Sequence, residues 1–132
     1  MRRLFQAAVL LAAVACSDNS TSPTVSLTGT YSLMMVNGQS LPYQFPTGSS
    51  DVVQLNNDVL TLNSNGTYTD VSQWTSSRTG NFTVTELGTY TATNGAITFF
   101  DQTDNTTYSG SLSGAVLTEI SSDGLTQVYQ KT

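Results

Sequence analysis

Two acidic residues and one basic residue are the first candidates for chemistry in this sequence. Asp70 and Glu86 fall in segments where apolar and polar residues alternate, and each shares a face with aromatic residues. Arg78 stands between the two segments. If both carboxylates point into a pocket, Arg78 would pair with them and form a polar anchor for a ligand. We favour the alternative, in which a shifted register or a position at the strand ends leaves these groups in solvent.

Catalytic chemistry has little other support. The chain has no His and a single Cys, which excludes a Ser/His triad, a Cys/His pair and the common zinc sites. Nothing fixes the separation of Asp70 and Glu86, so a glycosidase pair is not supported. Asp101, Asp104 and Asn105 offer oxygen ligands, but their spacing suits an ordinary turn better than a calcium loop. We therefore expect no enzyme, no metal and no cofactor.

A set of aromatic residues is the second candidate for a ligand site. Alternation along the expected strands directs these side chains to one side of the sheet. The set comprises Tyr31, Tyr68, Trp74, Tyr90, Phe99, Tyr108 and Tyr129. Their rings would either fill a dry core, which we favour, or line a shallow pocket for a small hydrophobic ligand.

The composition indicates that strands carry these residues. The 132-residue chain is 38% hydrophobic and only 10% charged, while Thr and Ser together supply 39 residues. Thr is β-branched and suits half-buried strands, and Ser is common in turns. The length fits one domain, so a single all-β fold has to account for the mature chain.

Turn dipeptides divide the chain into eight expected strands. Each supplies a residue that accepts positive φ: Asn37-Gly38, Asn65-Gly66, Asn94-Gly95, Ser113-Gly114 and Asp123-Gly124. The strands between these and other turns cover residues 29–36, 52–62, 67–75, 82–93, 96–101, 106–112, 115–121 and 125–131. The alternation slips at Asn56-Asn57-Asp58, where we expect a β-bulge.

Eight antiparallel strands favour a closed structure. An open sheet of this size leaves two exposed edges, whereas closure removes both edges and lets the inward residues share one core. We therefore predict an up-and-down barrel over residues 29–132 and no helix. A two-sheet sandwich satisfies the same alternation and is the alternative.

The first 28 residues read as an export signal and a tether. Arg2 and Arg3 precede an apolar run over residues 4–14, which is too short for a transmembrane helix. We predict a signal peptide over residues 1–15 and a flexible polar tether over residues 16–28.

The segment Ala13-Val14-Ala15-Cys16 resembles the lipobox of bacterial lipoproteins. The resemblance implies cleavage before Cys16 and acyl chains, such as palmitate, on the new N-terminal cysteine. Ser17 follows the cysteine in place of the Asp that retains lipoproteins at the inner membrane. The expected location is therefore the outer membrane, with the domain facing the periplasm or the exterior. Plain secretion is the alternative.

The strand pattern resembles a lipocalin-like domain. Gly29-Thr30-Tyr31 opens the first strand where lipocalins carry Gly-x-Trp, and a hairpin over residues 60–68 and a closing run over 127–131 follow. The resemblance implies a barrel that carries a small hydrophobic ligand.

The net charge of the mature chain limits the classes of partner that we expect. Without the leader, two cations stand against nine acids, a net charge of −7, which excludes nucleic acid as a partner. A membrane is expected to contact the chain only through the lipid anchor. The alternative to ligand binding is an envelope adaptor or inhibitor with a dry core. It would bind a protein partner through loops at residues 38–51 and 75–80.

Overall fold

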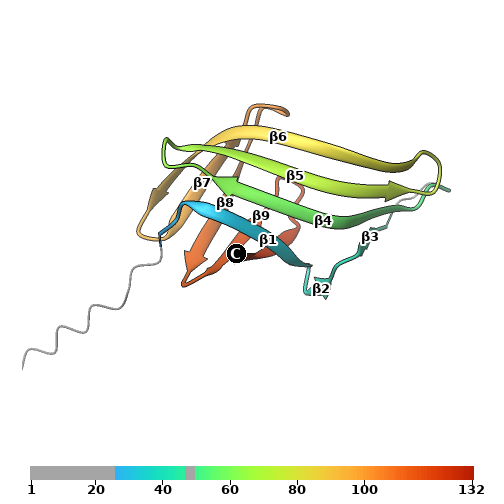
Figure 1. Ribbon diagram of the computed structural model, residues 1–132, viewed down its shortest axis with the longest axis horizontal. Coiled ribbons are helices and arrows are strands. Elements are labelled where there is room, and N and C mark those ends of the chain that lie inside the picture. Colours follow the sequence, from blue (N-terminus) through green and yellow to red (C-terminus); the bar gives the residue numbers. More distant parts are fainter. Residues whose placement is uncertain (1–25, 47–49) are drawn as a thin grey trace, which may run out of the picture.

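The computed structural model describes residues 26–46 and 50–132, which form ten β-strands (Figure 1). These are β1 (Gly29–Val36), β2 (Gln39–Ser40), β3 (Tyr43–Phe45), β4 (Val53–Leu62), β5 (Thr67–Ser76), β6 (Gly80–Thr93), β7 (Ala96–Asp101), β8 (Thr106–Ser113), β9 (Val116–Ile120) and β10 (Thr126–Lys131). Within the described residues there is no helix of the length and apolarity needed to cross a membrane. The expected signal peptide, Cys16 and most of the tether lie outside the described residues.

Eight of the strands close into one antiparallel barrel. Around the ring they follow the order β1, β10, β9, β8, β7, β6, β5 and β4, and β1 pairs with β4 to complete it. At this closure Gly29 faces Leu62, and Ser32 faces Val59. From β4 to β10 each strand pairs with the next strand in sequence, so the connectivity is up-and-down. The predicted closed barrel is confirmed, and the two-sheet sandwich is excluded.

Asn-Gly turns join neighbouring strands at the predicted places. Asn37 and Gly38 have φ of 49° and 77°, and Asn94 and Gly95 have φ of 52° and 81°. A type I′ turn needs positive φ at both central residues, which Asn and Gly adopt at low cost. These turns therefore fix the β1–β2 and β6–β7 hairpins.

A β-bulge in β4 confirms the predicted slip in the alternation. The register between β4 and β5 shifts between Leu55 and Asn57. Because β4 carries one extra residue at this point, Leu55 and Asp58 both point into the barrel although they are three residues apart. They are 1% and 3% exposed. The bulge thus places an acidic side chain in the interior.

Two short strands lie in the segment that we expected to be a loop. β2 pairs with β1, and β3 pairs with β4 so that Tyr43 faces Leu55. The Leu41–Pro42 peptide bond between these strands is cis. Strands of two or three residues are too short to show a period of two, so the pattern did not predict them. β3 brings Phe45 to one end of the barrel.

β5 and β6 form a long hairpin (Figure 1). β4 follows it as far as Ser76, whereas β7 pairs with β6 only from Gly88 onward, so the hairpin reaches beyond β7. Ser76 faces Gly80, so β6 begins two residues before the expected strand. The Asp51 carboxylate holds this turn, because it accepts hydrogen bonds from Ser76 Oγ and Ser77 Oγ, both at 2.9 Å.

Large apolar side chains fill the barrel toward one end, the packed end. The start of β1 and the β4–β5, β6–β7 and β8–β9 turns bound this end. Its most deeply buried side chains are those of Tyr31, Leu60, Leu62, Tyr68, Phe99, Leu117 and Tyr129. Tyr68 meets Phe99 edge to face at 5.5 Å between ring centroids. The opposite end, bounded by the β5–β6, β7–β8 and β9–β10 turns, is named the cavity end.

Candidate functional site

A cavity of about 190 Å³ lies at the cavity end of the barrel. Side chains from β3 and from β5 to β10 build its wall, together with the β7–β8 and β9–β10 turns. Asp104, Ser122 and Asp123 on its rim are exposed, so the cavity reaches solvent between these turns. The barrel interior is therefore packed toward one end and hollow toward the other.

Negative charge dominates the wall of the cavity. Its carboxylates, apart from Asp123 on the rim, belong to Asp70, Glu86, Asp101, Asp104 and Glu119. No Lys or Arg of the described residues lines it. Arg78 is exposed on the β5–β6 turn, and Lys131 is at the packed end, where its ammonium donates to the carbonyl of Thr28 at 2.6 Å. The positive charges of the described residues thus lie outside the cavity.

The strand register explains why carboxylates from separate strands meet here. Asp70 in β5 faces Glu86 in β6, and Gly88 in β6 faces Asp101 in β7. Residues two apart on a strand share a face, so Glu86 and Asp101 are diagonal neighbours on the inner side. Glu119 enters the same space from β9.

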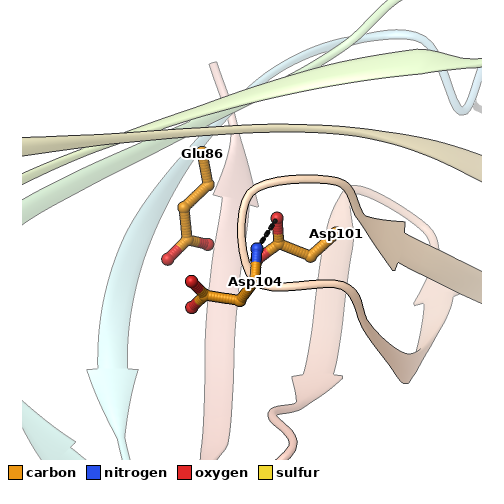
Figure 2. A group of neighbouring side chains, drawn as sticks. All are labelled: Glu86, Asp101 and Asp104. Carbon is orange, nitrogen blue, oxygen red and sulfur yellow. Dashed lines mark hydrogen bonds between the residues drawn. The ribbon is translucent and has the colours of Figure 1, made fainter.

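Glu86, Asp101 and Asp104 form a compact group at the rim, shown in Figure 2. One carboxylate oxygen from each lies within 4.8 Å of the others. Asp101 Oδ1 accepts hydrogen bonds from the amides of Thr103 at 2.7 Å and Asp104 at 3.3 Å, so Asp101 also shapes the turn. Burial, with the charges of Asp101 and Asp70, raises the pKa of Glu86 to about 7. The group offers oxygen ligands to a cation.

Two of the buried carboxyl groups, those of Asp58 and Asp70, are hydrogen-bond partners of one another. Asp58 lies behind the cavity wall, diagonal to Asp70 on the inner face of β4 and β5. Burial raises the pKa of Asp58, and the neighbouring Asp70 raises it further. The Tyr129 hydroxyl also donates to Asp58 Oδ2 at 3.4 Å. A proton shared between the two carboxyl groups accounts for their otherwise unpartnered Oδ1 atoms.

Glu119 interacts with the Tyr129 hydroxyl, but one of its carboxylate oxygens is left without a partner in the described part of the chain. Its side chain is 2% exposed, and Oε1 has no hydrogen-bond partner among the described residues. Burial raises the pKa of Glu119 well above its ordinary value, and the charges of Asp70 and Glu86 act in the same direction, while the hydrogen bond with Tyr129 opposes them only in part. A buried carboxylate without a positive partner is costly, so Glu119 either keeps a proton or requires a cation beside it.

Aromatic rings form one side of the cavity. Trp74 and Phe45 line it, with ring centroids 5.2 Å apart. Trp74 Nε1 donates to Ser72 Oγ at 2.7 Å, and Phe82 stacks on the indole at 6.2 Å. The hydrogen bond and the stack fix the orientation of the indole. Tyr108 completes the wall, and its hydroxyl donates to that of Tyr68 at 3.1 Å.

Apart from Arg78, the candidate residues from the sequence fall into three groups in the structure. Asp70, Trp74, Glu86 and Tyr108 line the cavity. Tyr31, Tyr68, Phe99 and Tyr129 are buried in the core, and Tyr90 packs against it with its hydroxyl donating to the carbonyl of Asn63 at 2.6 Å. Cys16 lies outside the described residues.

The interpretation that we favoured for Asp70 and Glu86, acids left in solvent, is wrong, because both line the cavity inside the barrel. Their pairing with Arg78, the other interpretation, is not found either. Arg78 is exposed at the tip of the β5–β6 hairpin, and its amide donates to Asp51 at 3.2 Å. Six residues of extended strand separate either acid from the turn that carries Arg78, a span of about 20 Å. The acids remain inside the barrel without this cation.

Three important side chains were not among the sequence candidates. Glu119 alternates with the apolar Leu117, a signal that would have identified an inward acid. Asp58 points inward only because the bulge resets the register of β4. Phe45 follows a segment with no readable period, and no local signal places it on the cavity.

Comparison with protein-family models, with curated proteins and with solved structures found no match to this chain. The functional argument therefore depends on the site itself.

Proposed function

We propose that this chain is a membrane-anchored lipoprotein of the cell envelope whose lipocalin-like barrel binds a small ligand without transforming it. The cavity, with the buried Oε1 atom of Glu119 in its wall left without a hydrogen-bond partner among the described residues, is the observation that carries the binding role. A scaffold with a dry core gains nothing from a buried carboxylate, because burial of the charge opposes folding. In a binding protein, the bound ligand stabilises the folded state and offsets the cost of the buried carboxylate.

The position of the chain before β1 supports an anchor that leaves the cavity accessible. Leu27 packs against the core at the packed end, where β1 begins. A lipid on Cys16 would therefore attach through the tether to the end opposite the cavity. The ligand cavity would then open away from the membrane.

Two measurements test this function. Cells labelled with radioactive palmitate should yield labelled protein from the wild type and none from Cys16→Ala, and unlabelled wild-type protein would refute the anchor. The purified protein should melt at a higher temperature with at least one member of a chemically diverse set of small molecules. No shift with any member would refute ligand binding.

The projecting β5–β6 hairpin favours a second candidate, an adaptor that binds a protein partner. Phe82 on this hairpin is 40% exposed. Photo-crosslinking from residue 79 in intact cells should recover one stoichiometric partner if this role holds, and diffuse crosslinks would reject it.

A further inference from the structure

The charge of the cavity indicates the charge of its ligand. Six carboxylates, those of Asp104 and Asp123 on the rim included, line a space that no Lys or Arg of the described residues enters. An anionic ligand would add to their repulsion, and a neutral ligand would leave the repulsion unrelieved. A cation relieves it and allows the acids to ionise.

Glu119 shows where the positive charge is needed most. Its Oε1 atom is buried in the wall and has no hydrogen-bond partner among the described residues. The proton shared by Asp58 and Asp70 does not provide a hydrogen bond to this Oε1 atom. An ammonium group offers several donors and positive charge in one small group, which suits a carboxylate with further acidic neighbours.

The aromatic side of the cavity indicates that the ligand also has a carbon body. Trp74 and Phe45 face the same space as the carboxylates. Their rings attract a cation through the π-face and also bury apolar surface. Because Ser72 and Phe82 hold the indole in place, little ordering of Trp74 is needed on binding.

The volume limits the ligand to a small molecule. About 190 Å³ is less than the roughly 300–1,000 Å³ of pockets that hold drug-sized ligands. The cavity therefore suits a body of about one aromatic ring with a short aminoalkyl arm.

From these observations we propose that the cavity binds a small organic cation, a protonated amine whose ammonium group lies against Glu119 and Glu86 and whose apolar body packs on Trp74. This inference rests on the proposed ligand-binding function and names the chemical class of the ligand.

A divalent metal ion at Glu86, Asp101 and Asp104 fits the observations less well. Asp101 Oδ1 already accepts two backbone hydrogen bonds. Glu119 is not part of that group, so a metal there would leave its Oε1 without a partner. The aromatic side would also have no role. Calcium is therefore included as a competing probe.

Isothermal titration with four probes tests the inference directly. Phenethylamine, phenethyl alcohol and phenylacetate share one ring and differ in charge, and calcium chloride is the fourth. At about pH 8 the amine is still protonated. We expect phenethylamine to bind at least about tenfold more tightly than the alcohol, and phenylacetate not to bind.

Matched variants locate the site. Glu119→Gln keeps the shape of the side chain and should weaken phenethylamine binding by about tenfold or more, whereas Asp51→Asn removes an equal charge outside the cavity and should not. Trp74→Leu should weaken binding too, and Phe100→Leu on the exposed outer face of β7 should not. Circular dichroism verifies that each variant is folded.

The outcomes separate this inference from the proposed function. Equal binding of the alcohol, binding of phenylacetate, or calcium binding without amine binding would overturn the amine assignment. The amine assignment would also be overturned if phenethylamine does not bind while other molecules of the diverse set raise the melting temperature. In that case the proposed ligand-binding function would still hold. If neither the four titration probes nor any molecule of the diverse set binds the folded protein, both the inference and the proposed function are wrong.

Discussion

Glu119 is the residue whose environment is hardest to explain by folding alone. It is fully enclosed beside other acids, and the pKa of its carboxyl is raised well above the ordinary value by burial. Above neutral pH this residue is therefore a source of instability in the ligand-free protein. This loss of stability is explained if the carboxylate of Glu119 serves to bind a ligand and not to stabilise the fold.

Glu119→Gln should accordingly stabilise the ligand-free protein at about pH 8, by about 1–3 kcal/mol, because it removes a buried charge without changing the shape. Urea unfolding monitored by circular dichroism measures the change. Thr107→Ala, at an exposed position of β8, serves as the control. A loss of stability in Glu119→Gln would contradict the account of this site.

Gly88 contributes to stability in a different way, because the absence of a side chain leaves room for the backbone of β7 and the ring of Tyr68. A Cβ at this position would meet the carbonyl oxygen of Phe100 and lie 2.7 Å from Tyr68 Cζ. We expect Gly88→Ala to lower the free energy of unfolding by about 2 kcal/mol or more, since neither the backbone nor the packed ring is free to move. Thr91→Ala, exposed on the same strand, is the control. Equal unfolding midpoints of both variants would be inconsistent with this packing.

Prediction from the sequence worked at the level of side-chain direction. Alternation placed Tyr68, Trp74 and Phe99 toward the interior, and the structure agrees. It failed for Asp70 and Glu86, which we expected in solvent and which line the cavity. Alternation gives the face on which a side chain lies, but it does not show whether the space on that face is filled, hollow or open to solvent. Alternation also carries no information on the distance between residues of different strands, such as Glu119 and Glu86.

The elements of the barrel were predicted well because each has a local signal. Turn residues with positive φ and a period of two mark all eight barrel strands. β2 and β3 have no such signal and form because β1 and β4 offer edges for pairing. That edge pairing brings Phe45 to the cavity, so part of the site depends on tertiary contacts that a sequence pattern does not record.

The bulge in β4 gives an element-scale prediction. Deletion of Asn56 removes the extra residue yet keeps Leu55 and Asp58 on the inner face, because they become two residues apart. We expect this variant to fold with a loss of about 1–2 kcal/mol. Circular dichroism and urea unfolding measure both properties.

Deletion of Val59 is the matched comparison. Val59 lies outside the bulge, so its deletion shifts the strand register by one residue. The residues on one side of the deletion then exchange their inner and outer faces, and we expect no folded protein. If both deletions fold equally well, the bulge does not set the register.

For the whole molecule, the acids of the interior predict how stability depends on pH. Burial raises the pKa of Asp58, Asp70, Glu86 and Glu119, that of Glu86 to about 7. Unfolded Asp and Glu titrate near about pH 4. The folded chain therefore binds more protons above that pH, so stability is greatest at low pH and falls as pH rises through the folded values.

We therefore expect a melting temperature at least about 4 °C lower at about pH 8 than at about pH 5, which corresponds to about 1 kcal/mol for a domain of this size. The groups that face the acids include Asp101, Asp104, Tyr108 and Tyr129, and burial also raises the pKa of both tyrosines, which stay neutral. Scanning calorimetry measures the difference. Glu119→Gln should reduce it, and a protein more stable at the higher pH would disprove the buried acid network.

A crystal structure of the protein with a brominated phenethylamine is the most direct measurement of the central claim, that the cavity at one end of this barrel binds a small organic cation. The account predicts an anomalous bromine peak beside Trp74, with the ammonium nitrogen within hydrogen-bond distance of Glu119. A bound amine found only on the outer surface, with the cavity filled by protein side chains or by water, would contradict it.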